Sequence, residues 1–368
     1  MAKAEETVLE IDLKALTHNF NYLKSKLTPE TKFLAVVKAF AYGSDAIEVA
    51  KHLENIGADY LAVAYAKEGV ALRDAGVSLP ILVLHPQPVN FKTLIDRCLE
   101  PSLYSMNVLN AFIAVAETCG QKQYPVHIKF NTGLNRLGFD YNDVGAITSQ
   151  LKKTNAIKAK SLFSHMAASE DLDEADFTKH QIESFKKIAE EFSGQIEYQP
   201  WLHMCNTSGV LNFPEAHFDM VRCGIGLYGF GNSPVEDKNF IPIASLKSVI
   251  SQIHTVNKGD SVGYNRAFKA ERTVKTATIP IGHADGLNRN YGKGNGCVSI
   301  NKQKAPIIGN VCMDMIMVNV TNIDCNEGDE VVIFDASHTA NDLAKSANTI
   351  SYEIITSISQ RVKRIYLK

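Results

Sequence analysis

Residues 33–43 read Phe33-Leu34-Ala35-Val36-Val37-Lys38-Ala39-Phe40-Ala41-Tyr42-Gly43. The first five residues form an uninterrupted apolar run, which is typical of a short strand buried on both faces of a sheet. Lys38 follows this strand directly, and an ammonium group there is costly to bury unless it is paired or neutral. We therefore expect Lys38 either to bind an anion or to be an amine suited to covalent chemistry, such as a Schiff base.

The same pattern of strand, turn and helix repeats along the first two-thirds of the chain. Amphipathic helical patterns, such as Ala46–Ile56, Ala66–Ala75 and Phe177–Phe192, separate the short apolar runs. Eight such units favour a closed (β/α)8 barrel of the TIM type over an open sheet of six or seven strands. We expect its strands at 33–38, 60–64, 81–84, 99–103, 126–130, 159–163, 198–202 and 219–222.

A change of pattern near residue 240 divides the chain into two predicted domains. We expect the barrel over residues 1–238, although its first strand, at 8–11, could instead join the second domain. A mostly β domain should follow over 239–368, and the polar segment 231–238 is predicted to be a linker. Its strands are expected at 243–256, 274–280, 298–300, 305–311, 316–320 and 330–334, before helices near 341–348 and 352–359.

The composition excludes several classes of function. A net charge of -2 gives no electrostatic basis for binding nucleic acid. No apolar run approaches the length of a membrane span, and we expect no secretory signal and no membrane partner. The 7 cysteines are scattered without a C-x-x-C pair, which is typical of reduced thiols in a cytoplasmic protein. The sequence indicates no metal site.

Polar residues follow five of the predicted barrel strands. In barrel enzymes the catalytic groups lie at the carboxyl ends of the strands. The residues that this rule selects are Lys38, Lys129, His165, His203 and Arg222. Each one alone is weak evidence. A single histidine there, for example, is more often a core residue whose ring nitrogens are hydrogen-bonded. Five on one rim indicate a catalytic site.

The loop after the eighth predicted strand is rich in glycine. It reads Arg222-Cys223-Gly224-Ile225-Gly226-Leu227-Tyr228-Gly229. Barrel enzymes bind phosphate in such loops, where glycines let backbone N–H groups approach the anion. The loop also fits a G-x-G-x-x-G dinucleotide motif, but a β domain follows it in place of the required βαβ unit. A plain tight turn remains the alternative.

These motifs together resemble those of alanine racemases, which are pyridoxal-phosphate enzymes of fold type III. The resemblance covers nearly the whole chain. It implies a (β/α)8 barrel with a C-terminal β domain, an amino-acid substrate and a homodimer that shares its active sites. It also implies D-alanine production for cell-wall peptidoglycan. The motifs lie at Val8–Leu13, Ala35–Ala39, Ala41–Gly43, Thr132–Gly133, Arg136–Gly138, Met220–Arg222, Gly224–Ile225, Leu227–Gly229, Val262–Tyr264, Ala284–Gly286, Val311–Asp314 and Tyr352–Glu353.

The resemblance assigns the catalytic roles. Lys38 would hold pyridoxal phosphate as a Schiff base and serve as one of two bases. Tyr264, contributed by the partner subunit, would be the second base, because racemisation removes a proton from one face and returns it to the other. His165 and Arg222 would link Tyr264 to the pyridine nitrogen. Since an arginine keeps its proton, that nitrogen should stay unprotonated.

The resemblance also assigns binding roles. Arg136 and Met313 would contact the substrate carboxylate and the O3′ side of the cofactor, with Asp314 beside them. Lys129 matches a lysine that is carbamylated in many members of the family. The remaining cofactor-binding candidates, mostly for the phosphate, are Tyr42, Asn206, Thr207, Ser208, Gly224, Ile225 and Tyr352, of which Ser208 rests on its position beside Thr207 alone.

Four positions depart from the family pattern: Phe40, Ser44, His283 and Gln360. They bear on substrate range and cofactor affinity. The function of a racemase for another small amino acid, such as serine, therefore remains an alternative. A pyridoxal-phosphate decarboxylase is a weaker alternative, since such enzymes typically place an acidic residue where Arg222 stands. A carrier without turnover is disfavoured because binding alone needs no second base.

Overall fold

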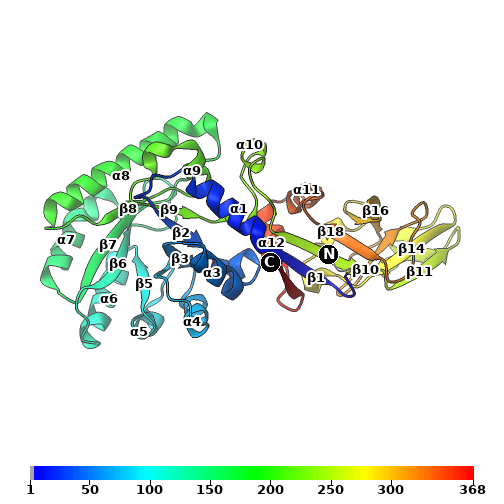
Figure 1. Cartoon of the computed structure of the whole chain (residues 1–368), viewed down its shortest axis with the longest axis horizontal. Coiled ribbons are helices and arrows are strands. Elements are labelled where there is room, and N and C mark those ends of the chain that lie inside the picture. The colour runs from blue at the N-terminus through cyan, green and yellow to red at the C-terminus, as the bar shows by residue number, and fades with distance from the viewer. Residues whose placement is uncertain (1–3) are drawn as a thin grey trace.

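The computed structural model describes residues 4–368, and it confirms an eight-stranded parallel barrel followed by a mostly β domain (Figure 1). The barrel strands pair in the order β8-β7-β6-β5-β4-β3-β2-β9. They are β2 (Lys32–Val36), β3 (Tyr60–Val63), β4 (Ile81–Val83), β5 (Leu99–Leu103), β6 (Tyr124–Lys129), β7 (Ile157–Phe163), β8 (Trp201–His203) and β9 (Met220–Cys223).

The barrel is nearly closed between β8 and β9. The N–H of Asp219 donates to the carbonyl of Leu202 at 3.1 Å, and the N–H of Arg222 donates to the carbonyl of Cys205 at 3.0 Å. The strand predicted at 198–202 begins later, at Trp201, because Pro200 has no N–H to donate to a neighbouring strand. His203 is therefore the last residue of β8.

Helices cover the outside of the barrel (Figure 1). The first begins after Asp12, whose side chain accepts hydrogen bonds from the N–H groups of Lys14 and Ala15. Its buried face carries Leu16, Phe20 and Leu23 at helical spacing. The helices are α1 (Leu13–Lys24), α3 (Ala46–Asn55), α4 (Ala66–Asp74), α5 (Phe91–Asp96), α6 (Met106–Thr118), α7 (Val144–Lys153), α8 (Ala175–Gln195) and α9 (Thr207–Asn212).

The second domain takes strands from both ends of the chain. Its nine-stranded sheet has the order β11-β14-β17-β16-β15-β18-β10-β1-β19. Strand β1 (Val8–Asp12) pairs antiparallel with β10 (Ala244–Val249) and so lies in the second domain, the alternative place given for strand 8–11. It also pairs parallel with β19 (Lys363–Leu367), a strand that the sequence did not predict. The other elements are β11 (Gln252–Val256), β14 (Val274–Ile279), β15 (Cys297–Ile300), β16 (Gln303–Ile308), β17 (Ile316–Asn319), β18 (Glu330–Phe334), α11 (Ala340–Ser346) and α12 (Ser351–Ser357).

Two expectations about this half of the chain need correction. The strand predicted at 243–256 is two strands, because β10 pairs with β1 and β18 whereas β11 pairs with β14. The linker predicted at 231–238 contains a short helix, α10 (Pro234–Asp237), whose cap Ser233 accepts from the N–H of Glu236. Glu236 is buried, so this segment is an ordered part of the barrel rim.

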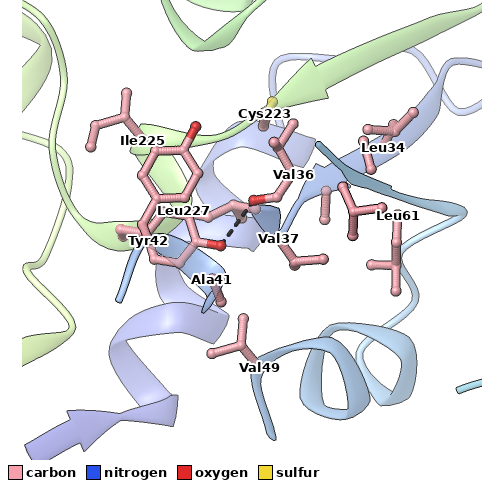
Figure 2. Close-up of a cluster of buried hydrophobic side chains, with 14 of the residues drawn as sticks. Leu34, Val36, Val37, Ala41, Tyr42, Val49, Leu61, Cys223, Ile225 and Leu227 are labelled. Carbon is pink, nitrogen blue, oxygen red and sulfur yellow. Dashed lines mark hydrogen bonds between the residues drawn. The ribbon is translucent and has the colours of Figure 1, made fainter. Parts of the chain in front are cut away.

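A buried apolar cluster fixes the carboxyl end of β2, where Lys38 follows. Figure 2 shows Val36 and Val37 at its centre, with Tyr42 and Ile225 on one side and Leu61 on the other. This packing holds the strand end rigid beside the loop that follows β9. Among residues 4–368, no helix combines the length and apolar character that crossing a bilayer requires.

Candidate active site

A cavity of about 430 Å³ opens at the carboxyl ends of the barrel strands. It brings together most of the predicted site residues: Lys38, Tyr42, Lys129, Arg136, His165, Asn206, Thr207, Arg222, Gly224, Ile225 and Tyr352. A larger hollow, of about 1040 Å³, lies over β15 and α11 in the second domain and contains none of them. Because chemistry in this fold occurs at the strand ends, the smaller cavity is the candidate active site.

Lys38 is followed by a left-handed turn of four residues that are not glycine. Ala39, Phe40, Ala41 and Tyr42 have φ between 50° and 56°. This conformation costs about 1–2 kcal/mol per residue with a side chain. The turn is therefore imposed by its surroundings rather than by local preference, as is common where a chain positions functional groups.

Contacts from distant parts of the chain hold this turn. The N–H of Ala39 donates to Glu68 Oε1 at 2.6 Å. Arg364, on β19, donates from Nη2 to the carbonyl of Gly43 at 2.8 Å, and its guanidinium lies 5.4 Å from the ring centre of Phe40. The second domain thus clamps the segment that carries Lys38.

The environment of Lys38 favours its neutral amine. Burial lowers the pKa of Lys38, Arg136 lowers it further, and Glu68 partly opposes them. Only the neutral amine is a nucleophile or a base. Lys38 is therefore suited to form a Schiff base with an aldehyde and to remove a proton.

Arg222 lies buried at the end of β9, which pairs directly with β2. Its guanidinium donates to His203 Nδ1 at 2.8 Å, to His165 Nδ1 at 3.1 Å and to the carbonyl of Ser164 at 2.7 Å. Burial lowers the pKa of Arg222 to about 10, so the group stays charged at neutral pH. The pKa of His165 lies well below its usual range because of burial and the nearby Arg222, so His165 is neutral.

Lys129 adds another cationic side chain to the cavity. Burial, then Arg222, Arg136 and Lys38, lower the pKa of Lys129 to about 8. Together these four side chains make the cavity strongly attractive to an anionic ligand. A fraction of Lys129 is the free amine at neutral pH, which is the form that reacts with carbon dioxide.

The loop after β9 forms one wall of the cavity. A Cβ atom on Gly224 would lie 2.5 Å from the hydroxyl of Tyr42, so only glycine fits there. Ile225 begins a short 3-10 helix, Ile225–Tyr228, and the first N–H groups of a helix lack partners within it. The Tyr42 ring stacks on Tyr228 with ring centres 4.4 Å apart, which fixes its hydroxyl beside this loop.

Ser208 and Tyr352 are placed by a buried carboxylate. The Ser208 hydroxyl donates to Glu236 Oε2 at 3.0 Å, and Ser208 does not line the cavity. Glu236 also accepts from the N–H of Asn232 at 2.7 Å. The Asn232 Oδ1 in turn accepts from the hydroxyl of Tyr352 at 3.1 Å. The α10 segment therefore positions Tyr352 at the cavity.

Ser208 and His203 do not line this cavity, and neither do three predicted site residues of the second domain. Tyr264 and Met313 lie on the second domain with exposed fractions of 75% and 59%. Asp314 forms an ion pair with Arg361 at 2.7 Å. Tyr264 occupies a short turn between β12 (Ser261–Val262) and β13 (Phe268–Lys269). Within the single chain, these side chains are therefore separate from Lys38.

Two polar side chains that line the cavity were not predicted from the sequence, His85 and Asn232. His85 directly follows the predicted strand 81–84, so the strand-end rule could have selected it. Asn232 lies in the segment that was predicted to be a linker, and no local signal marks it. Its role depends on α10 folding against the barrel.

Comparison with known proteins identifies the family. Residues 11–232 match the N-terminal domain of alanine racemase, and residues 243–366 match its C-terminal domain. The chain belongs to the alanine racemase family. It is 35% identical to alanine racemase 2 of Caldanaerobacter subterraneus subsp. tengcongensis, over 98% of this chain and 95% of that protein. Members of this family are pyridoxal-phosphate-dependent isomerases that racemise amino acids.

Solved structures of alanine racemases share this fold over the whole chain. The enzyme of Clostridium difficile 630 superposes with a TM-score of 0.93 at 33% identity, covering 100% of this chain and 97% of that one. The enzyme of Bartonella henselae, described with covalently bound pyridoxal phosphate, gives a TM-score of 0.88 at 28% identity and covers 99% and 100% of the two chains.

The residues of the cavity fit pyridoxal phosphate. Lys38 supplies an amine whose pKa is lowered by burial and by Arg136. The start of the helix at Ile225, approached through Gly224, suits a phosphate group. Arg222, which lines the same cavity, presents a charged hydrogen-bond donor. The donor set therefore matches an aldehyde, a phosphate and a hydrogen-bond acceptor on one ligand.

Proposed function

We propose that this chain interconverts L- and D-alanine with pyridoxal phosphate held by Lys38. One observation carries the proposal: Lys38 follows β2, Arg222 lies at the end of its paired strand β9, and both line one cavity with the helix start at Ile225. When bound, the cofactor would draw electrons from the amino acid and so acidify its α-proton. Tyr42, Thr207, Gly224, Ile225 and Tyr352 would hold the phosphate.

Two bases are needed for the proton, and one chain supplies only one at the cavity. Lys38 is suited to work on one face because its pKa is lowered by burial and by Arg136. We propose that Tyr264 of a second copy works on the other face. The exposure of Tyr264 and Met313 in the single chain supports a homodimer in which each copy completes the site of the other.

Arg222 would set the electronic character of the site. A charged guanidinium only donates hydrogen bonds, so a ring nitrogen facing it stays unprotonated. Arg222 would thereby limit how far the bound cofactor draws negative charge into its ring, and so would favour return of the proton over side reactions.

The substrate is best assigned as a small amino acid bound by Arg136. Arg136 lines the cavity, where its guanidinium suits a carboxylate. We propose alanine as the substrate, with serine as the second candidate, and D-alanine for peptidoglycan as the use of the product. All 7 cysteines are free. Free thiols are typical of a reducing compartment, which supports the proposal of a cytoplasmic enzyme.

The assay uses purified protein loaded with pyridoxal phosphate. L-alanine should lose its optical activity, and D-alanine should accumulate to an equal amount. Borohydride should attach the cofactor to the peptide that contains Lys38, and the Lys38→Ala protein should show neither result. A parallel assay with L-serine tests the second candidate. Carbon dioxide release without D-alanine would instead support a decarboxylase.

A further inference from the structure

A chain of buried hydrogen bonds runs from Arg222 into the interior of the barrel. Arg222 Nη1 lies 2.8 Å from His203 Nδ1, and His203 Nε2 lies 2.8 Å from Ser161 Oγ. Ser161 Oγ lies 2.6 Å from His127 Nδ1, and His127 Nε2 lies 2.8 Å from Glu100 Oε2. The three middle residues are completely buried, so water does not compete for these bonds.

Only one arrangement of protons satisfies the whole chain. Arg222 can only donate, so His203 accepts at Nδ1 and donates from Nε2 to Ser161. Ser161 then donates its hydroxyl proton to His127 Nδ1, and His127 donates from Nε2 to Glu100. If His127 donated to Ser161 instead, the Ser161 hydrogen would have no acceptor among the described residues, which is costly when buried.

Glu100 anchors the far end of the chain as a carboxylate. Burial raises the pKa of Glu100, but the hydrogen bond from His127, the nearby Lys160 and the hydroxyl of Tyr60 outweigh it and leave the pKa below its usual value. Lys160 Nζ lies 3.1 Å from Glu100 Oε1, and the Tyr60 hydroxyl donates to Oε2 at 2.7 Å. A guanidinium that only donates at one end and a charged acceptor at the other therefore favour the same direction for every hydrogen bond between them.

We propose that Glu100 is a positioning residue for Arg222, acting through His127, Ser161 and His203. With Glu100 ionised, His203 must present an unprotonated Nδ1 to the guanidinium. Reversing the chain would point a ring N–H of His203 at an N–H of Arg222. This inference rests on the proposed function only for its effect on racemisation, because the row of hydrogen bonds from Arg222 to Glu100 is a property of the folded protein.

The Glu100→Gln variant tests the direction of the chain. Its amide could present oxygen or nitrogen to His127, and the oxygen arrangement turns the amide nitrogen toward Lys160. We expect His127 and His203 to become mixtures of two tautomers. Long-range 1H–15N spectra of the histidine rings measure this directly, and the wild type should show single neutral rings with the proton on Nε2.

Kinetics then test the consequence for the active site. We expect kcat for alanine to fall about tenfold in Glu100→Gln and in Ser161→Ala, with KM changed less than about twofold, because Arg222 loses its fixed position. Ser102→Ala is the matched control. Ser102 is buried on β5 opposite His127, and its hydroxyl has no partner among the described residues. That variant should keep the wild-type tautomers and kcat.

The outcomes separate this proposal from the proposed function. A wild-type His203 that is charged, or that carries its proton on Nδ1, would contradict the proposed direction of the hydrogen bonds. Unchanged kcat in both Glu100→Gln and Ser161→Ala would overturn the positioning role. Wild-type spectra as expected from a protein that does not racemise alanine would leave the chain in place and reject the proposed function instead.

Discussion

Arg222 donates to His203 across 2.8 Å, and this bond joins a buried cation to a neutral ring rather than to a carboxylate. Burial lowers the pKa of His203 far below its usual range, and the charge of Arg222 lowers it further. The cation therefore has no negatively charged partner in this bond. Its attraction for an acceptor in the cavity is retained, which suits the proposed role of Arg222 in holding a ligand nitrogen.

Arg222→Lys should damage both stability and activity. A lysine has no planar fork, so it cannot donate at once to His203, His165 and the carbonyl of Ser164. We expect the free energy of unfolding to fall by about 2 kcal/mol and kcat to fall about 100-fold. Urea unfolding and the racemase assay measure these changes.

The matched control for that variant is Arg97→Lys. Arg97 forms an exposed ion pair with Asp74 at 2.7 Å. Surface pairs of this kind contribute little, so the free energy of unfolding should change by less than about 0.5 kcal/mol. Equal losses in both variants would contradict the role assigned to the Arg222 fork.

Lys129 should make stability depend on pH in the alkaline range. Its pKa is about 8 in the folded chain, whereas the ordinary value is 10.5. Between these two values the unfolded chain keeps a proton that the folded chain has released, so the free energy of unfolding rises with pH. Below about pH 8 both states hold the proton, and the folded state bears the full cost of burying the charged Lys129.

The comparison with Lys129→Met isolates this effect from other groups. In buffer free of carbon dioxide, the wild type should gain about 1–3 kcal/mol relative to the variant across that window. Denaturant unfolding at a series of pH values measures the difference. A constant difference between the two proteins would show that Lys129 titrates normally.

The free amine of Lys129 should also accept carbon dioxide. A carbamate would place a negative charge among Lys38, Arg136 and Arg222, each of which favours it electrostatically. With 13C-labelled bicarbonate, we expect one carbamate resonance in the wild type and none in Lys129→Met. A resonance that persists in the variant would assign the modification to another amine.

Arg364→Lys should release the left-handed turn after Lys38. Arg364 donates to the carbonyls of Gly43 and Ile358 and lies against Phe40. A lysine would lose most of these bonds, so we expect a loss of about 2 kcal/mol in stability and weaker retention of pyridoxal phosphate. Unfolding and the dissociation constant of the cofactor measure both.

The neighbouring residue gives the reciprocal control. Lys363 makes an exposed ion pair with Glu6 at 3.2 Å, and Lys363→Arg keeps its charge. We expect stability and cofactor binding to match the wild type. Arg364→Lys behaving like this control would mean that the turn does not depend on the second domain.

Hybrid dimers should test the shared site. Lys38→Ala and Tyr264→Phe proteins should each have little activity. A hybrid dimer has one site with both lesions and one with neither, so mixing under conditions of proven subunit exchange should restore activity. The expected limit is about one quarter of the wild-type rate per total protein, since half the dimers are hybrid and half their sites are intact. No recovery would contradict a site shared between two copies of the chain.

Much of the fold and part of the candidate active site could be predicted from short stretches of sequence. The apolar run 33–37 and the later strand patterns predict the barrel because buried parallel strands need continuous apolar residues. The strand-end rule brings Lys38, Lys129 and Arg222 together because parallel strands end at one rim. The same rule also selects His85, which follows the predicted strand 81–84.

Other features have no local signal. Glu100, His127 and Ser161 lie inside strands, where a polar residue normally predicts an exposed face. They point into the barrel because each satisfies another across neighbouring strands. The folding of segment 231–238 against the barrel and the pairing of β1 with β19 likewise depend on partners far along the chain.

The sequence alone determined the alternation of strands and helices, the lysine at the end of the first barrel strand and the glycine loop after the last. These depend on periodicity and backbone freedom within a few residues. Only the tertiary structure decided the left-handed turn at 39–42 and the direction of the bonds from Arg222 to Glu100. The turn costs free energy locally, and it persists because contacts such as Arg364 with Gly43, 321 residues apart, form only once both domains have folded. The bonds from Arg222 to Glu100 form only once strands β5 to β9 lie side by side in the barrel.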